Sequence, residues 1–191
     1  AWNSGLGPLG YKEIDRDLMV RFGNKPYIEV ETAFATLLPN SLNDKIVNKL
    51  ILFYIDKLKR NPELHDKIEF DIVHNSFSPE TEFQLKELKG ILNSNELKFF
   101  RKSLIELTQN IFKNYKKIKN QDLRTLKKLS LKRKKIFNSI NSLTLNQKLK
   151  KAVDLLDDAR SFGTPQFSRM ARLAFIGKQF LNGIKSVKVI N

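Results

Sequence analysis

The chain has 191 residues, 41% of them hydrophobic and 29% charged, a balance typical of a folded domain and not of a disordered polymer. The absence of cysteine excludes disulfides and thiolate catalysis, and no apolar run approaches the length of a membrane span. The chain begins with Ala and ends in the apolar stretch 187–191, so we expect a single domain or a segment of a larger protein. We expect a cytoplasmic location and no membrane partner.

The positive charge of +15 is concentrated in the second half of the chain. Residues 1–90 hold 12 Lys/Arg and 14 Asp/Glu, whereas residues 91–191 hold 23 and 6. Within 113–135 there are 11 basic residues and one acid, Asp122. This asymmetry divides the chain into a mixed part (1–90) and a basic helical part (91–191). It indicates either a polyanionic partner, such as nucleic acid, or a lysine-rich helix face exposed to solvent.

In the first part, the alternation of side chains predicts strands. Residues 19–22 and 27–31 predict two strands joined by turn residues at Gly23–Pro26, with Arg21 near the acids of the second strand. A third strand is predicted at 67–72, where apolar and charged residues alternate. It would join the hairpin, because two strands alone are only marginally stable.

Apolar residues at steps of three and four predict helices over most of the remaining chain. We expect helices at 42–60, 78–88, 94–118, 120–140, from Thr144, and from Thr164 onward. Antiparallel pairing of 94–118 with 120–140 would bury both apolar stripes. The predicted fold class is α+β and predominantly α-helical: a helical bundle with a small three-stranded antiparallel sheet near the N-terminal half.

The corner Arg160–Thr164, before the last predicted helix, is a candidate anion site. Gly163 is suited to end one helix, and Thr164-Pro165 to begin the next. Free amides at a helix start hold anions, and Arg169 and Arg172 share one helix face near this start. An ordinary capped helix with solvated arginines is the alternative reading.

Other motifs give little sign of chemistry. The sequence has no GxGxxG and no phosphate-binding loop, so no nucleotide site is predicted. His65 and His74 have no cysteine partner, and we expect a surface histidine and a strand-end histidine, not a metal site. Glu29 and Glu31 lie two apart on a predicted strand, where they form either a proton-transfer pair or a solvated strand face.

Four stretches together resemble the phosphoenolpyruvate synthase/pyruvate phosphate dikinase-related group of PEP-utilising proteins, and in particular their large members found with polysaccharide genes. They are Leu9–Tyr11 (LGY), Leu18–Val30 (LMVRFGNKPYIEV), Asn61–Phe70 (NPELHDKIEF) and Phe162–Phe175 (FGTPQFSRMARLAF). They run in family order and extend over most of the chain. The lysine-rich middle, 113–151, shows no motif match.

The resemblance implies that this chain is one part of a multidomain enzyme. In this family an ATP-grasp domain phosphorylates a histidine on a swivelling domain, which carries the phosphoryl group to an acceptor domain. In rifampin phosphotransferase relatives the acceptor-binding domain is largely helical. The ATP-binding motifs and the glycine-rich signature ending in Thr-Ser-His are absent here. The resemblance therefore implies an acceptor-binding segment that is not catalytic alone, with ATP and Mg bound elsewhere in the full-length protein.

The partners implied are the ATP-grasp and swivelling phosphohistidine domains of the same protein, and an unknown acceptor. Residue type and position suggest a cationic site for phosphate and substrate, made by Arg21, Tyr27, Arg160, Thr164, Arg169 and Arg172. Glu29 is the candidate catalytic base, and we expect these residues to share a cavity. The alternative function is a basic nucleic-acid- or polyanion-binding helical module that uses 113–135.

Overall fold

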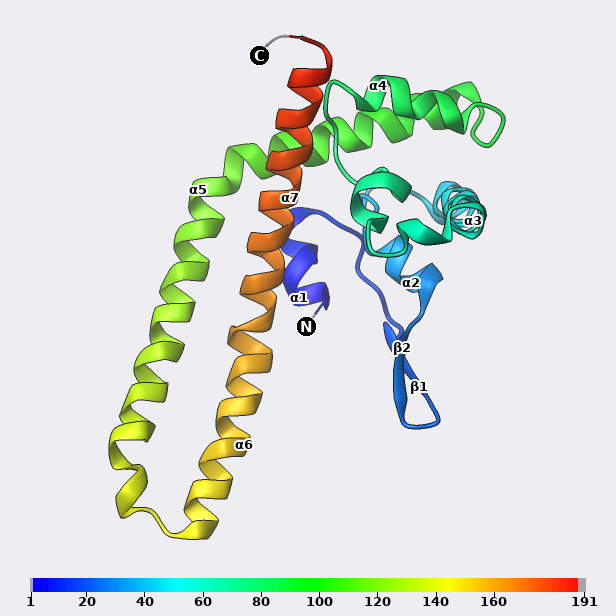
Figure 1. Cartoon of the computed structure of the whole chain (residues 1–191). Coiled ribbons are helices and arrows are strands. Elements are labelled where there is room, and N and C mark those ends of the chain that lie inside the picture. Colours follow the sequence, from blue (N-terminus) through cyan, green and yellow to red (C-terminus); the bar gives the residue numbers. More distant parts are fainter. Residues whose placement is uncertain (1, 189–191) are drawn as a thin grey trace.

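The computed structural model describes residues 2–188, so the two ends on which the expectation of a longer chain rests, Ala1 and 189–191, lie outside it. It has two recognisable parts (Figure 1). A compact part contains the short elements of the first half together with the start of a very long helix. A long arm is formed by the rest of that helix and by the last two helices. The predominantly helical α+β class is confirmed.

The helices are α1 (Trp2–Leu6), α2 (Val30–Ala35), α3 (Asp44–Arg60), α4 (Thr81–Gln84), α5 (Ser94–Ser139), α6 (Leu145–Phe162) and α7 (Thr164–Ser186). Short 3₁₀ turns are η1 (Gly7–Leu9), η2 (Pro62–Leu64), η4 (Leu85–Leu88) and η5 (Ile140–Ser142), and η3 (Ile68–Ile72) is a π-helical turn. The strands are β1 (Met19–Phe22) and β2 (Lys25–Ile28).

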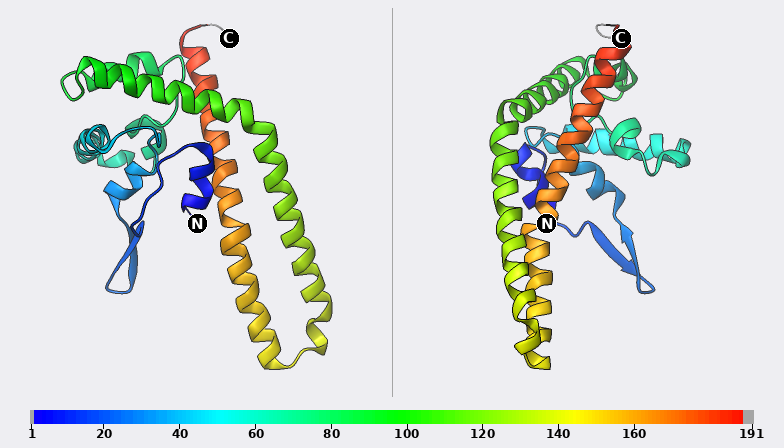
Figure 2. Two further views of the ribbon diagram at one scale, coloured as in Figure 1. Left: turned by 180° about the vertical axis from the view of Figure 1, so that it is seen from behind. Right: turned by 60° about the vertical axis from the view of Figure 1, so that its left-hand side comes forward.

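The two strands form the predicted hairpin, but the second strand ends early. Gly23 and Asn24 both have positive φ (54° and 63°), as a two-residue primed turn requires. Arg21 lies opposite Pro26, not opposite the acids. The chain leaves the sheet after Ile28, because the Glu29 carboxylate accepts hydrogen bonds from the amides of Glu31 and Thr32 and so caps α2. The hairpin projects from the body (Figures 1 and 2).

The predicted third strand is wrong, because residues 68–72 form the π-helical turn η3. The backbone groups of this segment are bonded locally and by side chains. The Val73 amide donates to the carbonyl of Ile68, and the amides of Asn75 and Gln179 both donate to the carbonyl of Glu69. These side-chain donors supply the hydrogen bonds that a neighbouring strand would have given. The alternation of apolar and charged residues therefore did not predict the backbone conformation here.

The predicted pairing of 94–118 with 120–140 is also wrong, since both belong to the single helix α5. Asn120 does not interrupt the helix. The second half of α5 instead runs alongside α6 and α7 in all three views (Figures 1 and 2). Thr144 begins α6 as predicted, through a reciprocal capping box with Gln147.

The predicted helix boundary at Gly163 is confirmed, because α6 ends at Phe162 and α7 begins at Thr164, but the chain does not turn a corner there. Gly163 stays in the right-handed helical region, its amide donates to the carbonyl of Ala159, and its own carbonyl accepts from Phe167. α6 and α7 are therefore almost collinear (Figure 1). Thr164 is the first residue of α7 and not its cap, and its hydroxyl donates back to the Ala159 carbonyl at 3.3 Å.

The core lies where α2 and α3 meet the start of α5. Phe34, Leu50, Tyr54, Phe100 and Leu104 are fully buried there. Each such side chain stabilises the fold by about 1.5–3 kcal/mol. The arm is thinly packed by comparison, because α6 contains no buried residue. Within residues 2–188, none of the helices has the length and apolarity needed to cross a bilayer.

Candidate functional site

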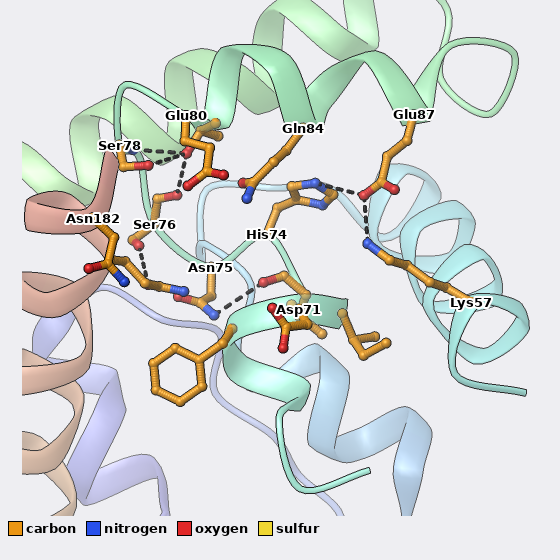
Figure 3. Close-up of a pocket in the computed structure, with 15 residues that line it drawn as sticks. Lys57, Asp71, His74, Asn75, Ser76, Ser78, Glu80, Gln84, Glu87 and Asn182 are labelled. Carbon is orange, nitrogen blue, oxygen red and sulfur yellow. Dashed lines mark hydrogen bonds and ion pairs between the residues drawn. The ribbon is translucent and has the colours of Figure 1, made fainter. Parts of the chain in front are cut away.

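A polar pocket of about 260 Å³ opens between α3, the segment after η3, the α4–η4 turn and α7 (Figure 3). Residues 70–76 form one wall. Lys57 comes from α3, Gln84 and Glu87 from the α4–η4 turn, and Gln179 and Asn182 from α7. Elements from both halves of the sequence therefore build this single polar cavity.

A chain of four side chains crosses one end of the pocket. Tyr54 Oη lies 3.1 Å from His74 Nδ1, His74 Nε2 lies 3.0 Å from Glu87 Oε1, and Lys57 Nζ lies 2.8 Å from the same oxygen. Burial raises the pKa of Tyr54 well above its usual range, so its hydroxyl keeps its proton. Tyr54 then donates to Nδ1 and the Nε2–H of His74 donates to the carboxylate. The network fixes the tautomer of His74 and the orientation of Glu87.

Glu87 is the group of this network best placed to meet a ligand. Partial burial would raise the pKa of its carboxyl, but hydrogen bonds from His74 and Lys57 outweigh burial and hold the pKa below its ordinary value. Both neighbours bind Oε1 (Figure 3). Among the described residues no hydrogen bond to Oε2 is seen, so an ionised, oriented oxygen is available to accept a proton or a hydrogen bond.

The pocket is acidic, although the protein as a whole is strongly basic. Asp71, Glu80 and Glu87 line it, and Lys57 is the one Lys or Arg among the described lining residues. Within residues 2–188, no three His, Asp or Glu side chains gather closely enough to hold a metal ion. The separated carboxylates and the amides of Gln84 and neighbouring residues suit a molecule rich in hydroxyl or amine donors.

A second cluster supports the wall behind the pocket. The Arg172 guanidinium donates to Glu69 Oε1 at 2.7 Å and lies 5.4 Å from the centre of the Tyr11 ring. The Tyr11 hydroxyl donates to the Asn75 carbonyl at 3.0 Å, and burial raises the pKa of Tyr11 to about 12. Asn75 and Gln179, which line the pocket, are fixed in turn by the Glu69 carbonyl. This cluster holds two pocket residues in place.

The seven residues proposed from the sequence do not share a cavity. Arg21, Tyr27 and Glu29 belong to the hairpin and its exit, Arg160 and Thr164 are exposed on the arm, and Arg169 and Arg172 are buried in ion pairs on α7. None of the seven lines the pocket of Figure 3.

The role of Glu29 also needs correction. Burial acts to raise the pKa of its carboxyl, but hydrogen bonds from Thr32 and Glu31 outweigh it and lower the pKa. Both carboxylate oxygens are occupied by those backbone amides, at 3.1 and 2.6 Å. Glu29 is therefore a helix cap and not a poised base.

Arg169 has a structural role as well. Its Nε and Nη2 donate to the two carboxylate oxygens of Asp122 at 3.0 and 2.7 Å, and its Nη1 donates to the carbonyls of Ser4 and Gly5. This one guanidinium joins α1, α5 and α7. Asp122 is the single acid of the basic run 113–135. An acid that stands alone among basic residues is a sequence signal for a buried charged partner.

Sequence reasoning missed Tyr54, Lys57 and Glu87 and assigned His74 to a strand end. Tyr54 lies on the apolar stripe of its helix, and Lys57 and Glu87 are ordinary surface types. These residues come from α3, from the segment after η3 and from η4. The three elements meet only in the folded chain, so no spacing in the sequence relates them.

Replacing Tyr54 by Phe should destabilise the protein by about 1–3 kcal/mol, because His74 Nδ1 then loses its buried hydrogen-bond donor. Urea unfolding followed by circular dichroism measures this. Tyr115→Phe is the matched control, since Tyr115 is exposed, and it should change the free energy of unfolding by no more than about 0.5 kcal/mol. Equal stability of Tyr54→Phe and wild type would contradict the network.

Comparison with protein-family models, with curated proteins and with solved structures returned no match for this chain.

Proposed function

We propose that the chain is the acceptor-binding helical segment of a multidomain ATP- or PEP-dependent phosphotransferase, and that it holds the acceptor in the pocket of Figure 3. One observation carries the proposal: three of the four stretches that resemble the PEP-utilising proteins meet in one cluster. Tyr11 comes from the first, Glu69 from the third and Arg172 from the fourth, and Glu69 and Arg172 are 103 positions apart. The cluster supports the pocket wall, so the resemblance and the pocket coincide.

The chemistry of the pocket fits an acceptor and not a phosphate donor. Transfer requires an acceptor hydroxyl held in line with the phosphorus and a group that takes its proton. The hydroxyl oxygen would attack phosphorus, the phosphorus–nitrogen bond to the visiting histidine would break, and the proton would pass to Glu87. A carboxylate serves this purpose in protein kinases, where an Asp accepts the substrate proton.

The remaining parts of the reaction belong to other domains under this proposal. The ATP-grasp domain would bind ATP and Mg, and the swivelling domain would carry the phosphohistidine. The segment contributes a shaped, acidic pocket that receives neutral or positively charged hydroxyl compounds. A cytoplasmic location is part of the proposal, because ATP is the expected energy source.

The proposal is tested in the full-length protein with ATP labelled in its transferable phosphate. Label should appear on a histidine outside this segment, and His65→Gln and His74→Gln should both retain that phosphohistidine. Peptide mapping of the acid-labile label makes the assignment. Label on His65 or His74 would overturn the proposal, since the segment would then carry the phosphoryl group itself.

The alternative, a polyanion-binding helix, is favoured by one observation. The basic residues of 113–135 lie on one uninterrupted helix, and all but Lys119 are exposed. Binding to a nucleic-acid duplex that weakens steeply with salt would support this function, because phosphate contacts release counterions. Binding lost on replacing Lys127 and Lys134 by Gln would locate it on α5.

A further inference from the structure

A second cavity, of about 510 Å³, lies between α5 and the α6–α7 junction, with Ser4 of α1 at one side. Its apolar wall includes Leu129, Phe162 and Pro165. It shares no lining residue with the pocket of Figure 3. Its size falls within the range of about 300–1,000 Å³ that is usual for small-molecule sites, and such sites are mostly apolar with a few placed polar groups.

Within the described part of the chain, two polar atoms of residues that line this cavity are buried without a hydrogen-bond partner, Asp158 Oδ2, which forms an ion pair with Lys132, and Gln166 Oε1. The Gln166 residue is 7% exposed, and among the described residues its Oε1 has no hydrogen-bond donor. Buried carbonyl oxygens of this kind are nearly always paired in folded proteins. A donor group of a bound molecule would give Gln166 Oε1 the hydrogen bond that it lacks.

The cationic side chains around the cavity differ in whether they already pair with a carboxylate. Arg169 is occupied by Asp122, and Lys132 contacts Asp158. Lys128 is exposed at the cavity, and no carboxylate within residues 2–188 lies within ion-pair distance of it. It is therefore the cation that a bound anion would meet without displacing an existing pair.

We propose that this cavity binds a small amphipathic anion. Its apolar body would pack on Leu129, Phe162 and Pro165, a hydroxyl or N–H would donate to Gln166 Oε1, and its acid group would lie beside Lys128. Because the cavity joins α5 to the α6–α7 junction, such a ligand would also brace the thinly packed arm. This site is independent of the acceptor pocket and goes beyond the proposed function.

The test uses two fluorescent probes and the whole 191-residue chain. The first, 1-anilinonaphthalene-8-sulfonate, has an aromatic body, an N–H and a sulfonate. The second, N-phenyl-1-naphthylamine, lacks only the sulfonate. The sulfonate probe should bind with one-to-one stoichiometry. Ser161→Trp, which fills the cavity from its exposed rim, should weaken binding of both probes at least about tenfold.

Two further variants separate the contribution of Lys128 to probe binding from that of Gln166. Lys128→Gln should weaken the sulfonate probe about fivefold and leave the neutral probe unchanged, whereas Gln166→Leu should weaken both probes. Lys148→Gln and Leu149→Gln, on the exposed face of α6, are the matched controls and should change neither. Unchanged binding in Ser161→Trp, equal loss in Leu149→Gln, or no response to Lys128→Gln would each overturn the proposal.

Discussion

Replacing Arg169 by Met is expected to lower the free energy of unfolding by about 3–5 kcal/mol. The substitution leaves the Asp122 carboxylate buried without its cation and removes the donors to Ser4 and Gly5. Chemical unfolding in urea, read by far-ultraviolet circular dichroism, measures the loss.

The control is a double-mutant cycle with Asp122→Leu. The double variant should be more stable than Arg169→Met alone, because no unpaired charge stays buried. Arg160→Met, on the exposed side of the same arm, should change stability by no more than about 0.5 kcal/mol. If Arg169→Met were as stable as wild type, Arg169 would be free for a ligand, as the sequence suggested.

Under the proposed function, replacing Glu87 by Gln in the full-length protein should slow phosphoryl transfer to the acceptor by about 100-fold or more, because the group proposed to take the hydroxyl proton is lost. Formation of the phosphohistidine should not change, since the proposed function assigns that reaction to other domains. Rapid-quench measurement of label on histidine and on acceptor separates the two steps.

Glu82→Gln is the matched control for Glu87. Glu82 lies on the neighbouring α4 and pairs with Arg101 on the surface, away from the pocket lining. Glu82→Gln should leave the rate of phosphohistidine formation and the rate of transfer to the acceptor unchanged. A Glu87→Gln protein that transferred label to the acceptor at the wild-type rate would remove Glu87 from the mechanism and leave it as a partner of His74.

Local features of the fold were predictable because local residues decide them. Gly23 and Asn24 set the hairpin turn, Thr144 and Gln147 set the start of α6, and the stripe in 42–60 predicted α3. The third strand was not predictable, because donors from Asn75 and the remote Gln179 satisfy the backbone of η3. The helix boundary at Gly163 was predictable, since α6 ends at Phe162 and α7 begins at Thr164, but the change of direction failed, because a glycine allows a sharp turn without imposing one.

The site was harder to predict than the fold. The arginines of α7 were proposed as phosphate or substrate ligands, but they pair with Asp122 and Glu69, which lie 47 and 103 positions away. Only the fold shows that these charges are paired. The hydrogen-bond network at the pocket is made by Tyr54, His74 and Glu87, which are common residue types at unremarkable spacing. Physical reasoning from sequence finds local motifs, and here the chemistry comes from non-local contacts.

Single-turnover transfer from the isolated phosphoenzyme to a panel of neutral sugars and polyols tests the account most directly, with wild type compared against Gln84→Trp. Gln84 is exposed at the pocket, so a Trp there fills the cavity without disturbing the core. The account predicts that Gln84→Trp forms phosphohistidine normally and that label then fails to reach the acceptor. Transfer at the wild-type rate with the pocket filled would contradict it.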